Sequence, residues 1–216
     1  MPDGTKLDIQ LPEKCGALLE AHRYKIVVGG RGKAGSWSCA RALLLQGYTQ
    51  PLRILGAREI MRTIADSVHQ LLCDQIRLLG LERFYKTTDS EITGRNGTAF
   101  LYAGLRQLDA TKIMSLEGVD RCWVEQGETI SKRSWEILIP TVRKPGSEIW
   151  INLNPQLDSD ETYQRFIEHP PHDCATIRMT WRDNPWFRAE LEKERQTMLR
   201  RVEQKLETRE TYDNIW

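Results

Sequence analysis

The sequence predicts an α/β protein whose central sheet is mainly parallel. Short apolar segments typical of buried strands alternate along the chain with segments of helical periodicity, and short loops separate them. The clearest unit spans residues 24–45, where an apolar run at 26–28 stops at a glycine-rich turn that opens into a stretch of helix formers. With 216 residues, the chain is long enough for one such domain with a full core.

The turn at residues 29–36, GGRGKAGS, has the composition of a phosphate-binding loop. Glycines let backbone N–H groups close around phosphate oxygens, a helix N-terminus adds partial positive charge, and a hydroxyl such as that of Ser36 can hold Mg²⁺. The motif G-x-x-x-x-G-K-[ST], begun at the first glycine, requires lysine at position 35, where this chain has Gly35. We therefore expect phosphate binding, with Lys33 or Arg31 in place of the usual lysine; a tight turn without a ligand is the alternative.

Composition restricts the classes of function. The formal net charge is +1 with 28% charged residues, so overall charge gives no reason to expect a polyanion partner. The N-terminus lacks an apolar signal-peptide core, and no segment approaches the roughly 18 uninterrupted apolar residues of a membrane span, so we expect a cytosolic protein with no membrane contact. Widely spaced cysteines of odd number predict reduced thiols rather than disulfides or a zinc site; they are Cys15, Cys39, Cys73, Cys122 and Cys174.

The elements of the N-terminal half follow from periodicity and turn residues. Residues 1–14 are expected to form a loose arm and residues 15–21 a short helix. After the helix that follows the glycine turn, residues 52–57 (LRILGA) indicate a short buried strand, and residues 60–79 place apolar groups at helical spacing. Residues 87–104 alternate about a GRNG turn, which predicts an antiparallel hairpin.

The same alternation continues in the C-terminal half. A serine cap opens one helix there, and a Lys-Pro-Gly turn closes it. The expected elements are a polar connection with a helical turn at 109–118, an apolar strand with an acidic end at 121–127, a helix at 131–142, a strand at 148–153, a helix within 156–172, a strand at 174–181 and a long solvated helix at 186–209.

The strand at residues 121–127 leads into a second group of chemical interest, which consists of Glu125, Gln126 and Glu128. A nucleotide hydrolase uses an apolar strand that ends in an acid to set a carboxylate beside Mg²⁺, with a following acid or amide to orient the attacking water. Any buried strand can end in a surface glutamate, so this motif alone is weak evidence. Downstream of a phosphate loop, it favours nucleotide hydrolysis.

Together these stretches resemble the N-terminal ATPase domain of the large terminase subunit of tailed bacteriophages, the motor that packages DNA. The matching segments are EAHRYK, GGRG, SWSCARALL, RILGARE, TKIMSLEGVDRCWVEQGETISKRSWEILIPTVRKPGSEIWINLNP, DETYQRF and DNPWF. The resemblance implies a P-loop NTPase of the RecA-like, additional-strand type, with a central mainly parallel sheet flanked by helices. It also implies an N-terminal arm at residues 1–20 and the ATPase domain at 21–216, without the nuclease domain of the family.

The resemblance further implies the residues of a site for ATP and Mg²⁺. Ser36 would supply the hydroxyl for Mg²⁺, and Glu125 would be the acid that holds this ion through water. Arg31 suits the negative charge that develops on the γ-phosphate, and Arg23 is expected to meet the nucleotide as well. The nucleotide loop carries over to Gly30, Arg31, Gly32, Lys33, Ala34, Gly35, Ser36 and Trp37.

Two departures from the family pattern affect the chemistry. Gly35 stands where the loop usually has lysine, and Gln126 stands where many relatives have a catalytic glutamate. A glutamine can orient water but cannot take its proton, so Glu128 is the candidate substitute. At the end of the strand at 148–153, the stretch Asn152-Leu153-Asn154 matches the family's coupling segment, in which a strand-end polar pair senses the γ-phosphate, and Asn154 is the residue that carries over. The Asp-Asn pair of DNPWF matches without an assigned role.

The function that the resemblance implies is hydrolysis of ATP to drive double-stranded DNA into a procapsid, at a low rate in the isolated domain. The expected partners are the portal protein, the small terminase subunit and further copies in a ring, with a monomer in isolation and a location in the host cell cytoplasm. The alternatives are a hydrolysis-deficient nucleotide- or DNA-binding module of the same fold and another P-loop enzyme. A helicase would normally carry a second core domain, and a small-molecule kinase would need an acceptor-binding lid that the sequence does not show.

Overall fold

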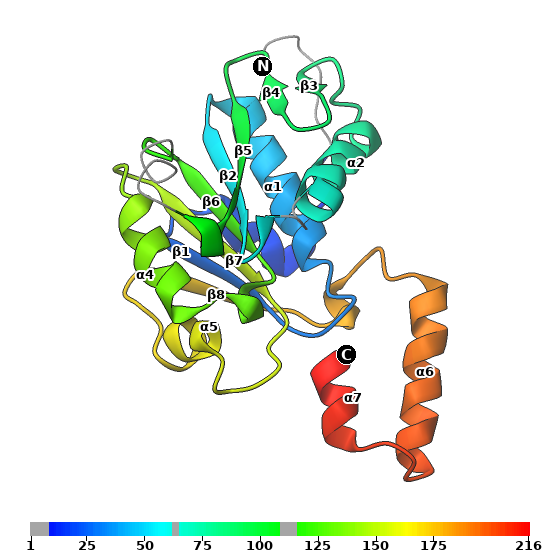
Figure 1. Cartoon of the computed structure of the whole chain (residues 1–216). Helices are drawn as coiled ribbons and strands as arrows, with labels where there is room; N and C mark the ends of the chain where they lie inside the picture. The colour runs from blue at the N-terminus through cyan, green and yellow to red at the C-terminus, as the bar shows by residue number, and fades with distance from the viewer. Residues whose placement is uncertain (1–8, 62–64, 109–115) are drawn as a thin grey trace.

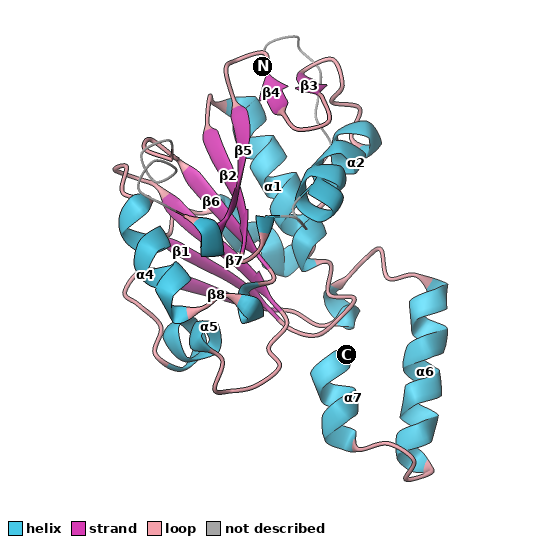
Figure 2. Ribbon diagram, in the orientation of Figure 1, coloured by secondary structure: helices cyan, strands magenta, loops and turns pink. Residues whose placement is uncertain are grey.

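The computed structural model describes residues 9–61, 65–108 and 116–216, which form an eight-stranded sheet with helices on both faces (Figures 1 and 2). The strands are β1 (Tyr24–Val28), β2 (Arg53–Arg58), β3 (Tyr85–Thr87), β4 (Ile92–Gly94), β5 (Ala99–Gly104), β6 (Arg121–Glu125), β7 (Glu148–Leu153) and β8 (Cys174–Arg178). The helices are α1 (Gly35–Thr49), α2 (Gln70–Leu78), α4 (Lys132–Thr141), α5 (Glu161–Tyr163), α6 (Ala189–Glu203) and α7 (Arg209–Ile215). Short helical turns lie at Glu13–Leu19, Ala65–His69, Leu105–Gln107, Gly127–Thr129, Gln164–Glu168 and Trp181–Asp183.

The order of the strands decides which loops lie together. In the described part of the chain the order is β3-β4-β5-β2-β6-β7-β1-β8, and the strands from β5 to β8 in this order are parallel. Strands β3 and β4 extend one edge as antiparallel strands. Strand β7 lies between β1 and β6, which is the additional strand of the RecA-like arrangement, so the predicted fold class is confirmed. The carboxyl ends of β1, β6 and β7 therefore meet at the same edge of the sheet.

Successive residues of the central strands pack into two different cores. On β1, Val27 joins the core beneath α1 and α2, whereas Ile26 and Val28 join the core beneath α4 and α5. The two helical layers lie on opposite sides of the sheet in Figure 2. On β7, Trp150 likewise faces the α1 side, and its neighbour Ile151 faces the α4 side. Because the strands are buried on both faces, they appear in the sequence as nearly continuous apolar runs.

Several of the predicted elements are confirmed. The hairpin appears as β4 and β5, and β7 occupies the residues predicted for that strand. The expected serine cap opens α4, where the Ser131 hydroxyl accepts a hydrogen bond from the Ser134 N–H. Strand β8 ends earlier than predicted, at Arg178. Within the predicted helix at 60–79, residues 65–78 are helical and residues 62–64 lie outside the described residues, as does most of the expected connection at 109–118.

The expectation of a loose arm is wrong for the described residues before residue 15. A helical turn occupies Glu13–Leu19, and within it the side chains of Cys15 and Leu18 are fully buried. Leu11 packs against the same core, and Lys14 forms an ion pair with Asp183 at 2.9 Å. The apolar residues interspersed in this polar stretch therefore anchor it against the body of the protein.

The long helix predicted at 186–209 is also wrong, because the chain forms two helices. Helix α6 ends before Lys205, which adopts a left-handed conformation with φ of 58°, and the Thr208 hydroxyl then caps α7 by accepting from the Thr211 N–H. The buried guanidinium of Arg195 on α6 donates to the Tyr212 hydroxyl on α7. Figure 1 shows this helix pair projecting from the sheet, with the chain end directed back toward it.

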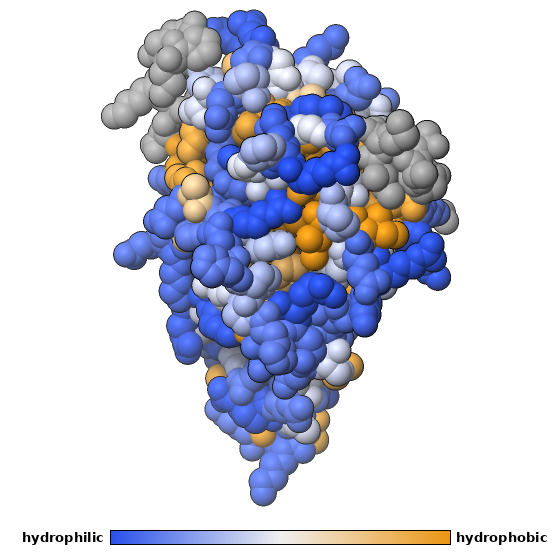
Figure 3. Space-filling view, turned by 90° about the vertical axis from the view of Figure 1, so that its left-hand side faces the viewer, coloured by the Kyte–Doolittle hydropathy of each residue, from blue (hydrophilic) through white to orange (hydrophobic). Residues whose placement is uncertain are grey.

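The surface of this projecting pair is strongly polar. Its tapered end forms the lower part of Figure 3 and is almost entirely hydrophilic, which agrees with the predicted solvated helix face. Across the described residues, no helix combines the length and the apolar character that crossing a bilayer requires.

Candidate functional site

A pocket of about 610 Å³ lies at the carboxyl edge of the sheet, a size typical of small-molecule sites. Its walls come from the β1–α1 loop, the ends of β6 and β7, and the segment that enters α6. The lining residues are Gly30, Arg31, Gly32, Lys33, Ala34, Gly35, Ser36, Trp37, Glu125, Gln126, Glu128, Asn152, Asn154, Asn184, Trp186, Arg188, Glu190 and Leu191. The structure thus brings together every site residue predicted from the sequence except Arg23.

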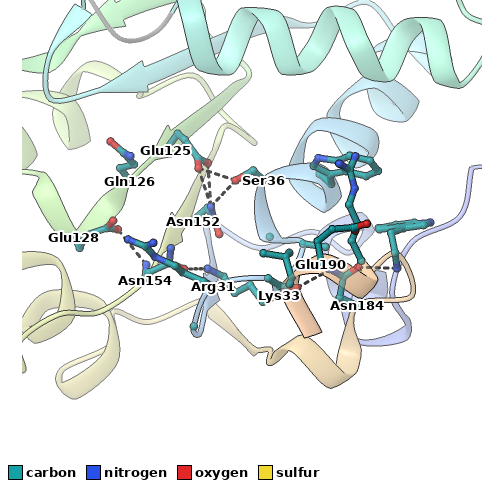
Figure 4. Close-up of a pocket in the computed structure, with 18 residues that line it drawn as sticks. Arg31, Lys33, Ser36, Glu125, Gln126, Glu128, Asn152, Asn154, Asn184 and Glu190 are labelled. Carbon is teal, nitrogen blue, oxygen red and sulfur yellow. Dashed lines mark hydrogen bonds between the residues drawn. The ribbon is translucent and has the colours of Figure 1, made fainter. Parts of the chain in front are cut away.

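Three side chains at the ends of α1, β6 and β7 form a hydrogen-bonded cluster (Figure 4). The Ser36 hydroxyl donates to Glu125 Oε1 at 2.7 Å. The Asn152 Nδ2 group donates to the same oxygen at 3.0 Å, to Glu125 Oε2 at 3.1 Å and to the Ser36 hydroxyl at 3.1 Å. The cluster follows from the sheet, because Glu125 and Asn152 are direct partners in the register of β6 and β7.

The cluster contains a desolvated carboxyl group and an amide oxygen without a hydrogen-bond partner among the described residues. Burial raises the pKa of the Glu125 carboxyl, and hydrogen bonds from Ser36 and Asn152 together with the charge of Lys33 oppose that shift. A carboxylate only accepts hydrogen bonds, so the amide of Asn152 must turn its NH₂ group toward Glu125. Its oxygen Oδ1 is then buried, with no hydrogen-bond partner among the described residues.

The donor set fits a hard divalent cation such as Mg²⁺. A hydroxyl and a carboxylate lie side by side in Ser36 and Glu125, and oxygen ligands of this kind are those that Mg²⁺ prefers. No group of three or more His, Cys, Asp or Glu residues within the described ranges could hold a metal by itself. Mg²⁺ typically takes one or two protein ligands and completes its shell with water and phosphate oxygens, so this small set is adequate for a nucleotide-bound ion.

Lys33 is buried beneath the loop, with 3% of its surface exposed. Its ammonium group donates to the Gly29 carbonyl at 3.2 Å, to the Leu153 carbonyl at 3.1 Å and to Asn154 Oδ1. These bonds use all three donors of the ammonium group. Burial lowers the pKa of Lys33 to about 8, although the charges of Glu125 and Glu128 act in the opposite direction. Lys33 therefore ties the loop to the end of β7, while the exposed Arg31 is a second cation at the pocket.

The chain after β6 turns Glu128 inward. Gln126 is exposed and adopts a left-handed conformation with φ of 56°, and the helical turn Gly127–Thr129 follows it. Glu128 Oε2 then accepts a hydrogen bond from the Asn154 N–H at 3.1 Å. In Figure 4 the carboxylate of Glu128 lies beside Asn154, whereas the amide of Gln126 points away from Ser36.

Arg23 corrects an expectation drawn from the resemblance, because it lies at the wrong end of β1 to meet a nucleotide. It precedes the strand, whereas the loop follows it, and five strand residues span roughly 16 Å. The Arg23 guanidinium donates to the Ser147 carbonyl at 2.9 Å and the Ser147 hydroxyl at 2.8 Å, and also to the Val142 carbonyl at 2.6 Å. Its observed contacts therefore join β1 to the end of α4 and the start of β7.

Sequence reasoning missed part of the pocket. Asn152 lies inside an apolar run that reads as a buried strand, and only the register of β6 and β7 reveals it as a neighbour of Glu125. The wall that precedes and begins α6 was also missed, although the DNPWF match contained a signal in Asn184 and Trp186. The segment carries residues as far as Leu191 into the pocket lining.

Comparison with known proteins places the chain in a family. The chain matches the family described as "Phage terminase large subunit" over residues 21–212. It is similar to the PBSX phage terminase large subunit of Bacillus subtilis (strain 168), with 26% identity over 148 residues, which is 67% of this chain and 34% of that protein.

Solved structures show the same fold at low sequence identity. The large terminase from a thermophilic bacteriophage aligns with a TM-score of 0.70 and 12% identity, over 88% of this chain and 50% of that chain. The large terminase ATPase domain of Thermus phage P74-26 aligns with a TM-score of 0.63 and 11% identity, over 91% of this chain and 88% of that chain.

These relatives differ from this chain in length. The chain spans about a third of the PBSX protein and half of the first of these solved terminases, as the 34% and 50% coverage values state. The family match nevertheless includes the glycine loop, the Ser36–Asn152–Glu125 cluster and all of the pocket lining. The chain therefore belongs to the phage terminase large subunit family.

Proposed function

We propose that this chain is an ATP-hydrolysing motor domain that takes ATP with Mg²⁺ and drives double-stranded DNA into a viral procapsid. The observation that carries the proposal is the cluster of Ser36, Asn152 and Glu125 beside a glycine loop, at the edge where three parallel strands end. Family membership supports it, as do the structures of the thermophilic bacteriophage large terminase in complex with ATP-gamma-S and with ADP.

The pocket offers complementary groups to the parts of a nucleoside triphosphate that carry charge. We expect backbone N–H groups of the loop and of the first turn of α1 to bind phosphate oxygens, with the Arg31 N–H exchanging its present partner, the Ile215 carbonyl, for phosphate. The exposed side chain of Arg31 would supply positive charge for the terminal phosphate. Ser36 and Glu125 would hold Mg²⁺, which when bound neutralises charge on the phosphate oxygens. Lys33 bonds to the Gly29 carbonyl of the loop and to the Leu153 carbonyl of β7, and its ammonium group adds positive charge to the site.

Glu128 is our candidate for the group that orients and deprotonates the attacking water. It is half-buried at the pocket, and its carboxylate is fixed by the Asn154 N–H. Gln126 is exposed and directed away from the cluster, so the glutamine at the family's usual catalytic position does not exclude catalysis. Glu128 can both orient water and accept its proton, which an amide cannot do.

Phosphate release from ATP with Mg²⁺ tests these roles, with double-stranded DNA present and absent. Glu125→Ala should nearly abolish turnover, and Glu128→Gln should lower it by about 10²- to 10⁴-fold, the usual cost of losing a general base. Gln126→Glu should change the rate little. Glu136→Gln, at an exposed glutamate of α4, is the matched control and should hydrolyse ATP like the wild type.

Two results would redirect the assignment. A large gain of rate in Gln126→Glu, with no loss in Glu128→Gln, would return the role of base to position 126. If no variant released phosphate even with DNA and at high protein concentration, the second candidate function, a nucleotide- or DNA-binding module without hydrolysis, would replace the motor. The features that favour this candidate are Gly35 in place of the usual loop lysine and Gln126 in place of a catalytic glutamate.

Assembly belongs to the same proposal and rests on family membership. We propose that residues 21–216 act as the motor domain, against which the described part of the segment at 1–20 packs, in a ring of copies that engages the portal protein and the small terminase subunit in the host cell cytoplasm. We expect the isolated chain to be a monomer with low turnover, because a ring of this kind supplies groups from neighbouring copies.

A further inference from the structure

One wall of the pocket has no role in the chemistry described so far. Glu125 and Glu128 lie at one side of the pocket in Figure 4, and Asn184 and Glu190 lie at the other, with Lys33 and Ser36 between them. Around this far side the lining includes two tryptophans and a leucine that is 39% exposed; they are Trp37, Trp186 and Leu191. A phosphate group gains no favourable contact from apolar surface, so we expect this wall to contact another part of the ligand.

The two tryptophans form a supported aromatic surface. Their ring centroids are 5.7 Å apart with an angle of 37° between the ring planes. The Arg41 guanidinium lies 4.2 Å from the centre of the Trp186 ring and 5.5 Å from that of Trp37. Arg41 is buried and is itself held by Gln75 at 2.7 Å and by the Gln10 carbonyl at 3.0 Å. A cation fixed in this way keeps the indole rings in position.

The aromatic surface is fastened to the phosphate loop. The side-chain NH₂ group of Asn184 donates to the Gly32 carbonyl at 2.6 Å, and the side-chain oxygen of Asn184 accepts a hydrogen bond from the backbone N–H of Trp186 at 2.8 Å. Gly32 has φ of +77°, and a Cβ at this position would lie 2.5 Å from the Phe187 ring, so the segment sits directly on the loop backbone. The distance between the loop and the aromatic surface is therefore set by the fold before any ligand binds.

We propose that Trp186 and Trp37 form the surface that receives the base of the nucleotide, so that the pocket selects a nucleoside phosphate over an inorganic polyphosphate. This inference rests on the proposed binding of nucleotide at the loop. Bases stack on indole rings through dispersion and quadrupole attraction, and larger purine rings gain more from such stacking than pyrimidines. Arg188 and Glu190, exposed charged residues of the pocket lining, would meet the polar edge of the base.

Calorimetric titration with ADP and with inorganic pyrophosphate, both with Mg²⁺, tests the proposal. Trp186→Ala should weaken ADP binding by roughly 5- to 150-fold, the range for loss of one base–aromatic stack, and should leave pyrophosphate binding unchanged. Trp186→Phe keeps an aromatic ring and should retain most of the affinity for ADP. Trp181→Ala is the matched control, since Trp181 lies on the same segment but stacks on Phe187, away from the pocket lining.

The outcomes separate this inference from the proposed function. Equal losses for ADP and pyrophosphate in Trp186→Ala, or no loss for either ligand, would overturn the base-binding surface while leaving the phosphate site in place. If Trp186→Ala failed to fold, the wild type would decide: ADP, GDP and CDP binding no more tightly than pyrophosphate would overturn the proposal. Failure of the folded wild type to bind either ADP or pyrophosphate would overturn the nucleotide site and this inference together.

Discussion

The glycine at position 35 should tolerate no larger residue, although a phosphate loop usually has lysine there. A Cβ on Gly35 would lie 2.2 Å from Asn152 Oδ1 and 2.8 Å from the Lys33 Cε atom, closer than such contacts occur in proteins. The backbone itself accepts a side chain, because Gly35 opens α1 and alanine is a better helix former than glycine. The expected effect of Gly35→Ala is therefore displacement of Asn152.

The hydrogen bonds of Asn152 set the size of this effect. Its Nδ2 group donates to both carboxylate oxygens of Glu125 and to the Ser36 hydroxyl. A hydrogen bond to a charged group contributes about 1.5–3 kcal/mol, and the gain in helix propensity returns at most ~1 kcal/mol. We expect Gly35→Ala to lower the free energy of unfolding by about 2 kcal/mol, which for a chain of this size lowers Tm by roughly 4–8 °C.

Thermal unfolding followed by circular dichroism measures this change. Gly16→Ala is the matched control, because no atom lies within 4 Å of a Cβ built at that glycine. In an Asn152→Ala background most of the penalty of Gly35→Ala should disappear, since the oxygen that the new Cβ meets is gone. The same clash predicts that Gly35→Lys lowers ATP turnover. A Gly35→Ala protein as stable as the wild type, or a Gly35→Lys protein that hydrolyses ATP faster, would refute this reasoning.

Two further predictions concern the cations. Burial lowers the pKa of Lys33 to about 8, and a phosphate group binds the charged ammonium form more tightly than the neutral amine. The affinity for ADP with Mg²⁺ should therefore fall as pH rises through 8. Lys33→Ala should bind ADP several-fold more weakly at pH 7, and its affinity should depend less on pH. The unfolded chain keeps this lysine protonated to about pH 10.4, so the contribution of Lys33 to the stability of the nucleotide-free protein should rise between pH 8 and about 10.4. If the wild type and Lys33→Ala showed the same dependence of ADP affinity on pH, the role of Lys33 at the phosphate would be contradicted. Arg23→Ala should lower the free energy of unfolding by about 1–3 kcal/mol in denaturant titration, through lost bonds to Ser147 and Val142, and leave ADP affinity unchanged. Weaker ADP binding in a folded Arg23→Ala protein would restore its predicted role at the nucleotide.

The sequence predicted the elements better than their arrangement. Apolar runs bounded by turn residues located β1 and β7, and a serine cap located the start of α4, because these signals are local. The sequence did not predict the break between α6 and α7, because the left-handed residue there is Lys205, whereas helix ends are usually marked by glycine or asparagine. The side chains that fix this break, Arg195 and Tyr212, meet across the helix pair, and no local pattern reveals such a contact.

The candidate site divides in the same way. The glycine loop, Ser36 and the acidic end of β6 could be recognised, since each is a short motif with a chemical meaning. Asn152 was matched only as part of the coupling segment; its contact with Glu125 could not be predicted, because it depends on β7 lying between β1 and β6, and strand order is a property of the whole sheet. Arg23 was misplaced for the converse reason: it is close to the loop in sequence, but a strand separates the two in space.

The end of β7 connects the parts of the site, and this gives physical content to the coupling role predicted for Asn154. Three consecutive residues, from 152 to 154, bond in turn to the Ser36–Glu125 pair, to Lys33 and to Glu128. Asn154 holds Lys33 through its side chain and Glu128 through its backbone N–H. We expect a phosphate at the loop to compete with Asn154 and Leu153 for the ammonium group of Lys33, and its departure to return that group to them. On this expectation the charge state of the loop would act on the position of Glu128 through Asn154, which bonds to both Lys33 and Glu128.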